Sequence, residues 1–159
     1  MYTAKARILD VLVIVKMDCE YDKSDAESTL IAFMRNMNAW EVDFYTVKME
    51  NLRKGVHSLD IYSDHVNWLE DILREFSAES KMNWGRLSDM GCIWPATYDV
   101  DRDDILLLSR DERKSIIEVK PGLGAFNHSK FCLKKSKEIW KIHRVYMLTY
   151  DNKWSRVSL

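Results

Sequence analysis

The sequence contains few of the residues that divide a chain into separate pieces, with only five glycines and two prolines among its 159 residues. Linkers between domains are usually rich in glycine, proline or small polar residues, and no such stretch, repeat or low-complexity segment occurs. A chain of this length buries about two-thirds of its unfolded surface in one core. We therefore expect a single domain spanning residues 1–159.

Cysteine is scarce as well. Cys19, Cys92 and Cys132 are widely spaced, match no metal-ligand signature, and are too few by one to pair completely within the chain. None of the four histidines has a neighbouring His or Cys at ligand spacing. We expect no metal and no cofactor, and the simplest location is the reducing cytoplasm.

Long hydrophobic runs are missing too. Residues 8–15 are apolar except for Asp10, but a membrane-spanning helix needs about 20 apolar residues. No small-residue cleavage site of the usual form follows, so neither a membrane segment nor a signal peptide is expected. The β-branched residues of 6–17 favour a strand, whereas their apolar spacing also fits a helix. Residues 1–21 therefore add either a strand or a helix to the domain.

Charge is nearly balanced overall but uneven along the chain. The net charge is −1, and residues 121–159 hold eight basic and two acidic residues, so this part carries +6 and the first 120 residues carry −7. The basic part lacks clustered arginines, and we expect no nucleic-acid partner. One reading is a solvated basic hairpin on an acidic body. The other is two regions of opposite charge that steer a charged partner.

A long amphipathic helix is the strongest local pattern. Apolar residues recur at steps of three and four from Leu30 to Val47, as in a helix that buries one face. Residues 24–27 resemble a capping box with Ser24 as the N-cap, and Gly55 is a natural C-terminal cap. The helix then approaches 28 residues, or about 42 Å at 1.5 Å per residue.

A second helix is predicted to begin with Ser63 or Asp64 as its N-cap and to reach Phe76. Glu70 and Arg74 lie one turn apart on its outer face, where such a pair stabilises a helix slightly. From about residue 91 the spacing becomes that of strands. Helices followed by an antiparallel meander indicate an α+β fold with the helices on one face of a sheet. The predicted strands are 105–108, 115–119, 131–133, 139–149 and a last one containing Trp154 and Val157, with connections at 109–113, 121–124, 134–137 and 151–152.

The longest predicted strand carries apolar residues on both faces. One face should pack on the long helix, and the other lines a pocket, meets a second subunit or binds a partner. His143 is the one histidine that we consider as a general base, with a purely structural role as the alternative. The predicted alternation sets Trp140, Ile142, Tyr146 and Leu148 against Lys141, His143, Val145, Met147 and Thr149.

Residues 99–104 form an acidic segment that invites comparison with a calcium loop. Counting from Asp99, the sixth position is Asp104 instead of glycine and the twelfth is Arg110 instead of glutamate, so the match fails. The segment is then either a solvated loop or an acidic contact surface for a basic partner such as a nuclease domain. Aromatic residues are common interface anchors, and structural and binding roles both stay open for the tryptophans near residues 85–91. We predict five partner-binding residues, Asp99, Asp101, Asp103, Asp104 and Trp94, and no catalytic, cofactor or metal residue.

Four segments together carry a family resemblance: MRNMNAWE at 34–41, WGR at 84–86, PATYD at 95–99 and WKI at 140–142, with a final tryptophan strand. Over residues 25–159 the set resembles the nuclear transport factor 2-fold immunity proteins of bacterial polymorphic toxin systems. The resemblance implies a cone in which a long helix and shorter helices wrap on a curved antiparallel sheet. It also implies stoichiometric binding and neutralisation of a cognate toxin domain, and it transfers no catalytic residue. The segment 6–21 departs from the family pattern.

Two other functions remain open from the residues alone. The first is an isomerase-like or dehydratase-like enzyme on the same scaffold, which would need His143 beside a buried carboxylate in a deep pocket. The second is a small-molecule-binding or dimerising association module, for which a homodimer would be the signature.

Overall fold

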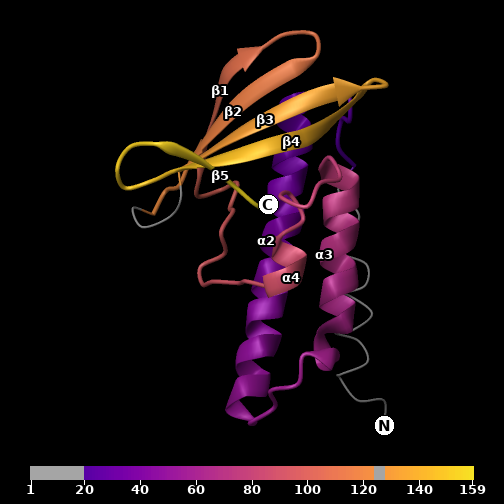
Figure 1. Ribbon diagram of the computed structural model, residues 1–159, viewed down its shortest axis with the longest axis vertical. Helices are drawn as coiled ribbons and strands as arrows, with labels where there is room; N and C mark the ends of the chain where they lie inside the picture. The colour runs from indigo at the N-terminus through magenta and orange to yellow at the C-terminus, as the bar shows by residue number, and fades with distance from the viewer. Residues whose placement is uncertain (1–19, 124–127) are drawn as a thin grey trace.

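The computed structural model describes residues 20–123 and 128–159 (Figure 1). The strand or helix predicted within residues 1–21 lies almost entirely outside the described residues, and a single domain over 1–159 stays a prediction. Helices come first and strands follow. The elements are α2 (Ala26–Arg53), η1 (Asp60–Tyr62), α3 (Ser63–Phe76), α4 (Arg86–Asp89), β1 (Asp104–Arg110), β2 (Lys114–Lys120), β3 (Ser129–Ser136), β4 (Ile139–Leu148) and β5 (Trp154–Val157).

The long helix α2 has the predicted 28 residues, but its N-terminal cap differs from the predicted one. Asp25 is the N-cap, and its carboxylate accepts from the Ser28 backbone N–H at 2.8 Å. The Ser24 hydroxyl instead donates to Asp22, so the prediction of Ser24 as the cap was wrong by one residue. At the other end Gly55 has a φ of +72°, the left-handed conformation that commonly follows a helix and that glycine adopts without strain.

Helix α3 begins at Ser63, so neither Ser63 nor Asp64 is its N-cap. The single turn η1 runs directly into it, and the N-cap position falls on Tyr62, whose side chain makes no capping bond. The predicted pair on the outer face is confirmed, with Arg74 Nη2 2.6 Å from Glu70 Oε1. None of the helices in the described part of the chain is both long and apolar enough to cross a membrane.

The five strands form one antiparallel sheet in the order β1-β2-β3-β4-β5, with α2 and α3 against one face (Figure 1). The predicted α+β class with helices on one face of a sheet is confirmed. Two hairpin loops are shorter than predicted, because Ser109 and Arg110 belong to β1 and residues 134–136 to β3. The β3–β4 turn is reduced to Lys137 and Glu138, which both have positive φ, as two-residue hairpin turns of this kind require.

The alternation predicted along β4 fails after His143. Cys132 pairs with Arg144 and Leu133 with Ile142, so His143 is an extra residue in β4. Such a bulge shifts the faces of all later residues and bends the sheet. Val145 therefore joins the core at 1% exposure, and Tyr146, predicted to share a face with Ile142, lies on the opposite one.

The core lies between the helices and the sheet. Phe33 and Trp40 of α2 are fully buried, as are Phe131 of β3 and Ile142 of β4. The Trp40 indole N–H donates to the His65 backbone oxygen at 2.9 Å, so the only polar atom of this buried ring is satisfied. The helical stripe around residues 34–41 is thus mainly core, as its spacing indicates.

Candidate partner-binding loop

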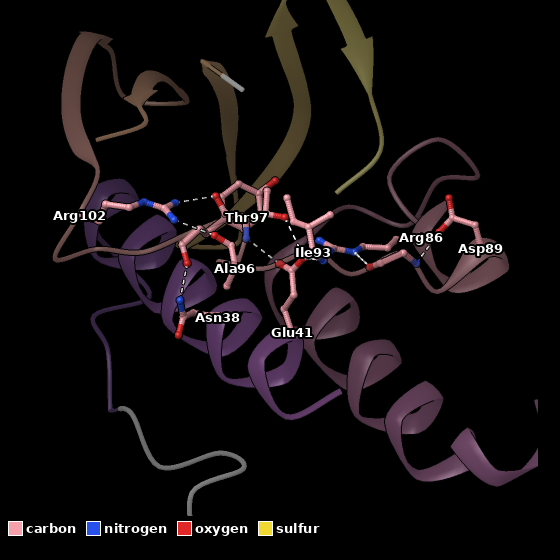
Figure 2. Close-up of polar contacts among 10 residues, drawn as sticks. Asn38, Glu41, Arg86, Asp89, Ile93, Ala96, Thr97 and Arg102 are labelled. Carbon is pink, nitrogen blue, oxygen red and sulfur yellow. Dashed lines mark hydrogen bonds and ion pairs between the residues drawn. The ribbon is translucent and has the colours of Figure 1, made fainter. Parts of the chain in front are cut away.

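Residues 91–103, here called loop 91–103, connect α4 to β1 and are anchored by one buried carboxylate on α2 (Figure 2). Glu41 is 0% exposed, and its Oε1 accepts from Arg86 Nη2 at 2.7 Å, from the Ile93 N–H at 3.0 Å and from the Thr97 hydroxyl at 3.0 Å. Its Oε2 accepts from the Thr97 N–H at 2.8 Å. A buried charge is tolerated when it is paired and hydrogen-bonded in this way. Glu41 therefore fastens both ends of the 93–97 segment to the long helix.

A second anchor lies within the loop itself. Arg102 donates to the backbone oxygens of Ala96 and Thr97 at 2.9 and 3.0 Å (Figure 2), and its Nε lies 2.5 Å from Asp103 Oδ1. The Asp103 carboxylate also accepts from the Asp99 N–H at 3.0 Å. Charge-assisted bonds of this kind are stronger than neutral ones and fix geometry. The loop is thus held in one shape before any partner arrives.

The structure distributes the five predicted residues over different environments. Asp103 is buried and occupied within the loop, and Asp99 is half-buried and accepts from the Asp101 N–H. Asp101 and Asp104 are exposed. Trp94 is 62% exposed and stacks on Tyr45 of α2, with ring centroids 5.9 Å apart. Partner contact stays a prediction, and the side chains accessible for it are those of Asp101, Asp104 and Trp94.

Comparison with known proteins gives information on the function of this loop. A family model described as NTF2 fold immunity protein matches residues 25–158. The chain belongs to this family. It is also similar to the immunity protein RhsIA of Dickeya dadantii (strain 3937), with 25% identity over 138 residues that cover 86% of this chain and 97% of that relative. No solved structure matches. The resemblance carried by residues 34–41 and the other three segments is therefore confirmed, together with the cone-shaped fold class.

A cavity of about 340 Å³ lies beside Glu41 and is lined by Cys92, Tyr98 and Met147, among others. Burial raises the pKa of Tyr98 to about 12 and also raises the pKa of the Cys92 thiol, so neither group readily loses a proton near neutral pH. The carboxylate of Glu41 is occupied by the four hydrogen bonds described above.

His143, the candidate general base, lies half-buried on β4. Burial, and then the positive charges of Lys134, Arg144 and Arg156, lower its pKa. Within residues 20–123 and 128–159, no hydrogen bond or ion pair joins its ring to a carboxylate, and no group of three acidic, His or Cys side chains could hold a metal ion. The carboxylate that the enzymatic reading requires beside His143 is thus not found there.

Sequence reasoning found part of this site. Glu41 and Thr97 belong to the segments 34–41 and 95–99, which were singled out in the sequence for the family resemblance. The charged partner of Glu41, Arg86, is 45 positions away, and no local pattern links the two. Asp103 was missed as an anchor because it sits among other aspartates of equal appearance, and only the fold shows which one turns inward.

Proposed function

We propose that this protein neutralises a bacterial toxin domain by forming a one-to-one complex with it. The observation that carries the proposal is the match of residues 25–158 to an immunity protein family. The name of the relative RhsIA, an immunity protein, supports the same role. The protein acts in the cytoplasm, where the thiols of Cys92 and Cys132 stay reduced.

The geometry of loop 91–103 suits tight binding. Interface energy concentrates in a few residues, among which tryptophan is enriched, and a loop that is already ordered loses little entropy on binding. Trp94 is exposed and held by its stack on Tyr45, while Asp101 and Asp104 offer negative charge to solvent. We propose that these three side chains contact a basic patch on the toxin domain, such as the nucleic-acid-binding surface of a nuclease.

The test is protection of living cells. A candidate toxin domain, sought in the gene immediately upstream, is expressed with and without the protein, and survival is followed. Neutralisation predicts that co-expression restores growth and that the two chains elute together as a one-to-one complex. Cells that die as fast with the protein as without it would contradict the proposal.

The contribution of the loop is tested by Trp94→Ala, with Leu59→Ala as the matched control because Leu59 is an even more exposed apolar residue at 79%. Loss of a central aromatic anchor costs about 2 kcal/mol or more, so Trp94→Ala should raise Kd at least about 30-fold, measured by titration calorimetry. The control should change Kd less than about twofold. Equal effects of the two substitutions would remove Trp94 from the interface.

A further inference from the structure

The sheet has a second face on which no helix packs in the described part of the chain (Figure 1). Along β2, Ser115, Ile117 and Val119 are buried, whereas Ile116 and Glu118 between them are only half-buried. Because side chains alternate between the faces of a strand, the second set points away from the helices. We call this side of the sheet the open face.

The pairing register shows which residues share the open face. One row across the strands contains Glu118, Lys130, Tyr146 and Arg156, in neighbouring pairs from β2 to β5. The next row contains Ile116, Cys132 and Arg144. Six basic side chains lie on this face by strand alternation and register, and four of them come from residues 121–159: Lys114, Lys120, Lys130, Lys134, Arg144 and Arg156.

In the described part of the chain, few carboxylates lie near these basic groups: Glu118 lies among them, and the charge of Lys114 helps to lower the pKa of Asp111. Among the described residues, Lys120 forms a long ion pair with Glu118, and the other five basic side chains take part in no ion pair. The one carboxylate in the middle of the face, Glu118, accepts or shares a hydrogen bond with His128 at 2.7 Å and lies 3.9 Å from Lys120. The lowered pKa of His143 is a second sign of the same excess, because after burial the charges of Lys134, Arg144 and Arg156 disfavour its cation.

The open face is also hollowed. A cavity of about 440 Å³ is lined by residues of β1 to β4, among them Ile116, Cys132, Lys134, Arg144 and Tyr146. The one acidic residue at its rim, Asp111, accepts from the backbone N–H groups of Arg113 and Lys114 and is thereby engaged locally. Apolar and aromatic side chains below basic ones form a site that matches an acidic side chain on a protein surface.

We propose that the open face is a docking surface for an acidic patch on the toxin domain, with one carboxylate side chain entering the hollow between Lys134 and Arg144. This inference rests on the function proposed above. It adds a second contact region of opposite charge to loop 91–103. Loop 91–103 leads through Asp104 to the Lys120 end of β2, whereas the hollow lies toward the other end of that strand, where Lys114 pairs with Lys134.

Two other occupants fit less well. A second copy of this chain would bring the same basic groups against themselves, and like charges across an interface cost several kcal/mol. A nucleic acid would meet Glu118 in the centre of the face, and one aromatic ring suited to stacking, Trp154, already carries Lys130 at 4.0 Å from its centroid. The sequence pI of about 6.4 is also far from that of typical nucleic-acid-binding domains.

The experiment compares the double variant Lys134→Glu and Arg144→Glu with a control of identical charge change, Arg35→Glu and Lys81→Glu, all four being exposed in the structure. Binding to the same candidate toxin domain is measured by calorimetry, and thermal unfolding confirms that both variants fold. Charge reversal in a central docking region should raise Kd about 100-fold or more, since each charged pair lost at an interface costs about 2 kcal/mol or more. The control should stay within about threefold of the unaltered protein.

The outcomes distinguish failure of this docking surface from failure of the proposed function. If the unaltered protein binds the toxin and the open-face variant binds equally well, the docking surface is wrong and the proposed function stands. If the unaltered protein does not bind, both fail. Light scattering and binding to a single-stranded RNA of about 20 nucleotides complete the test: a dimer, or an RNA complex, that only the open-face variant loses would assign the face to that occupant and overturn the inference.

Discussion

Among single residues, Glu41 has the most consequences. It is completely buried, and it accepts from Arg86 Nη2 and from the backbone N–H groups of Ile93 and Thr97. Removing one member of a buried ion pair leaves the other uncompensated and typically costs about 3–5 kcal/mol. We expect Glu41→Ala to lower the free energy of unfolding by about that amount, measured by urea denaturation.

The control is Glu79→Ala, because Glu79 is an exposed glutamate, and exposed substitutions usually change stability by less than about 0.5 kcal/mol. If Glu41→Ala costs no more than the control, the carboxylate does not anchor loop 91–103. Protease cleavage within the loop should accelerate in the Glu41→Ala variant alone, since a released loop is accessible.

His143 reports on the charge of the open face. Burial is the largest cause of its lowered pKa, and the positive charges of Lys134, Arg144 and Arg156 lower it further. Removing one of these charges with Arg144→Gln should therefore raise the pKa of His143, which titration of its ring signals by NMR measures directly. The exposed substitution Arg35→Gln, on α2, should leave that pKa unchanged.

The same shift sets a dependence of stability on pH. In the unfolded chain the pKa of this histidine is about 6.5, which is above the pKa of His143 in the folded protein. The unfolded state therefore binds the proton more tightly. The contribution of His143 therefore lowers stability as the pH falls below that value and vanishes above it. An unchanged pKa in Arg144→Gln would show that the arginine points away from the imidazole.

At the scale of secondary structure, the start of α2 is decided by Asp25. Its carboxylate accepts the Ser28 N–H, and replacing such an N-cap by alanine costs about 1 kcal/mol. Asp25→Ala should lower stability by about that amount in urea denaturation. Asp25→Asn keeps a capping oxygen and should cost only a few tenths, and Ser24→Ala should be neutral. A loss with Ser24→Ala equal to that with Asp25→Ala would restore the capping box read from the sequence.

Elements that depend on the spacing of nearby residues were predictable from the sequence. Features that depend on pairing with another strand were not. The stripe from Leu30 to Val47 gave α2 its length, because burial of one helical face depends only on residues three and four apart. The bulge at His143 depends on how β4 pairs with β3, which no spacing within β4 contains. For this reason the residues after it were assigned to the wrong faces.

The candidate site divides in the same way. Exposure of Trp94 agrees with its loop composition, since Gly91 and Pro95 near it favour irregular structure. Asp103 points inward because it pairs with Arg102 and accepts from the Asp99 N–H. The sequence does not distinguish it from the neighbouring aspartates. The open face was visible only as an excess of basic residues after residue 121, without the rows that the sheet creates.

At the scale of the whole molecule, a net charge of −1 conceals two regions of opposite sign. Fields from such regions act over about 8–10 Å at physiological salt and steer a complementary partner into register. Because the steering is a property of charge distribution and not of net charge, it should govern the rate of association more than that of dissociation.

The corresponding prediction concerns the association rate with the toxin domain, measured by stopped flow at increasing salt. Screening should lower this rate about tenfold or more between about 20 mM and 500 mM salt, with little change in the dissociation rate. Lys134→Glu with Arg144→Glu should flatten that dependence, because it removes the positive end of the pattern, whereas Arg35→Glu with Lys81→Glu should retain it. An association rate that ignores salt would mean that shape and apolar contact, including Trp94, bring the two proteins together without help from either charged region.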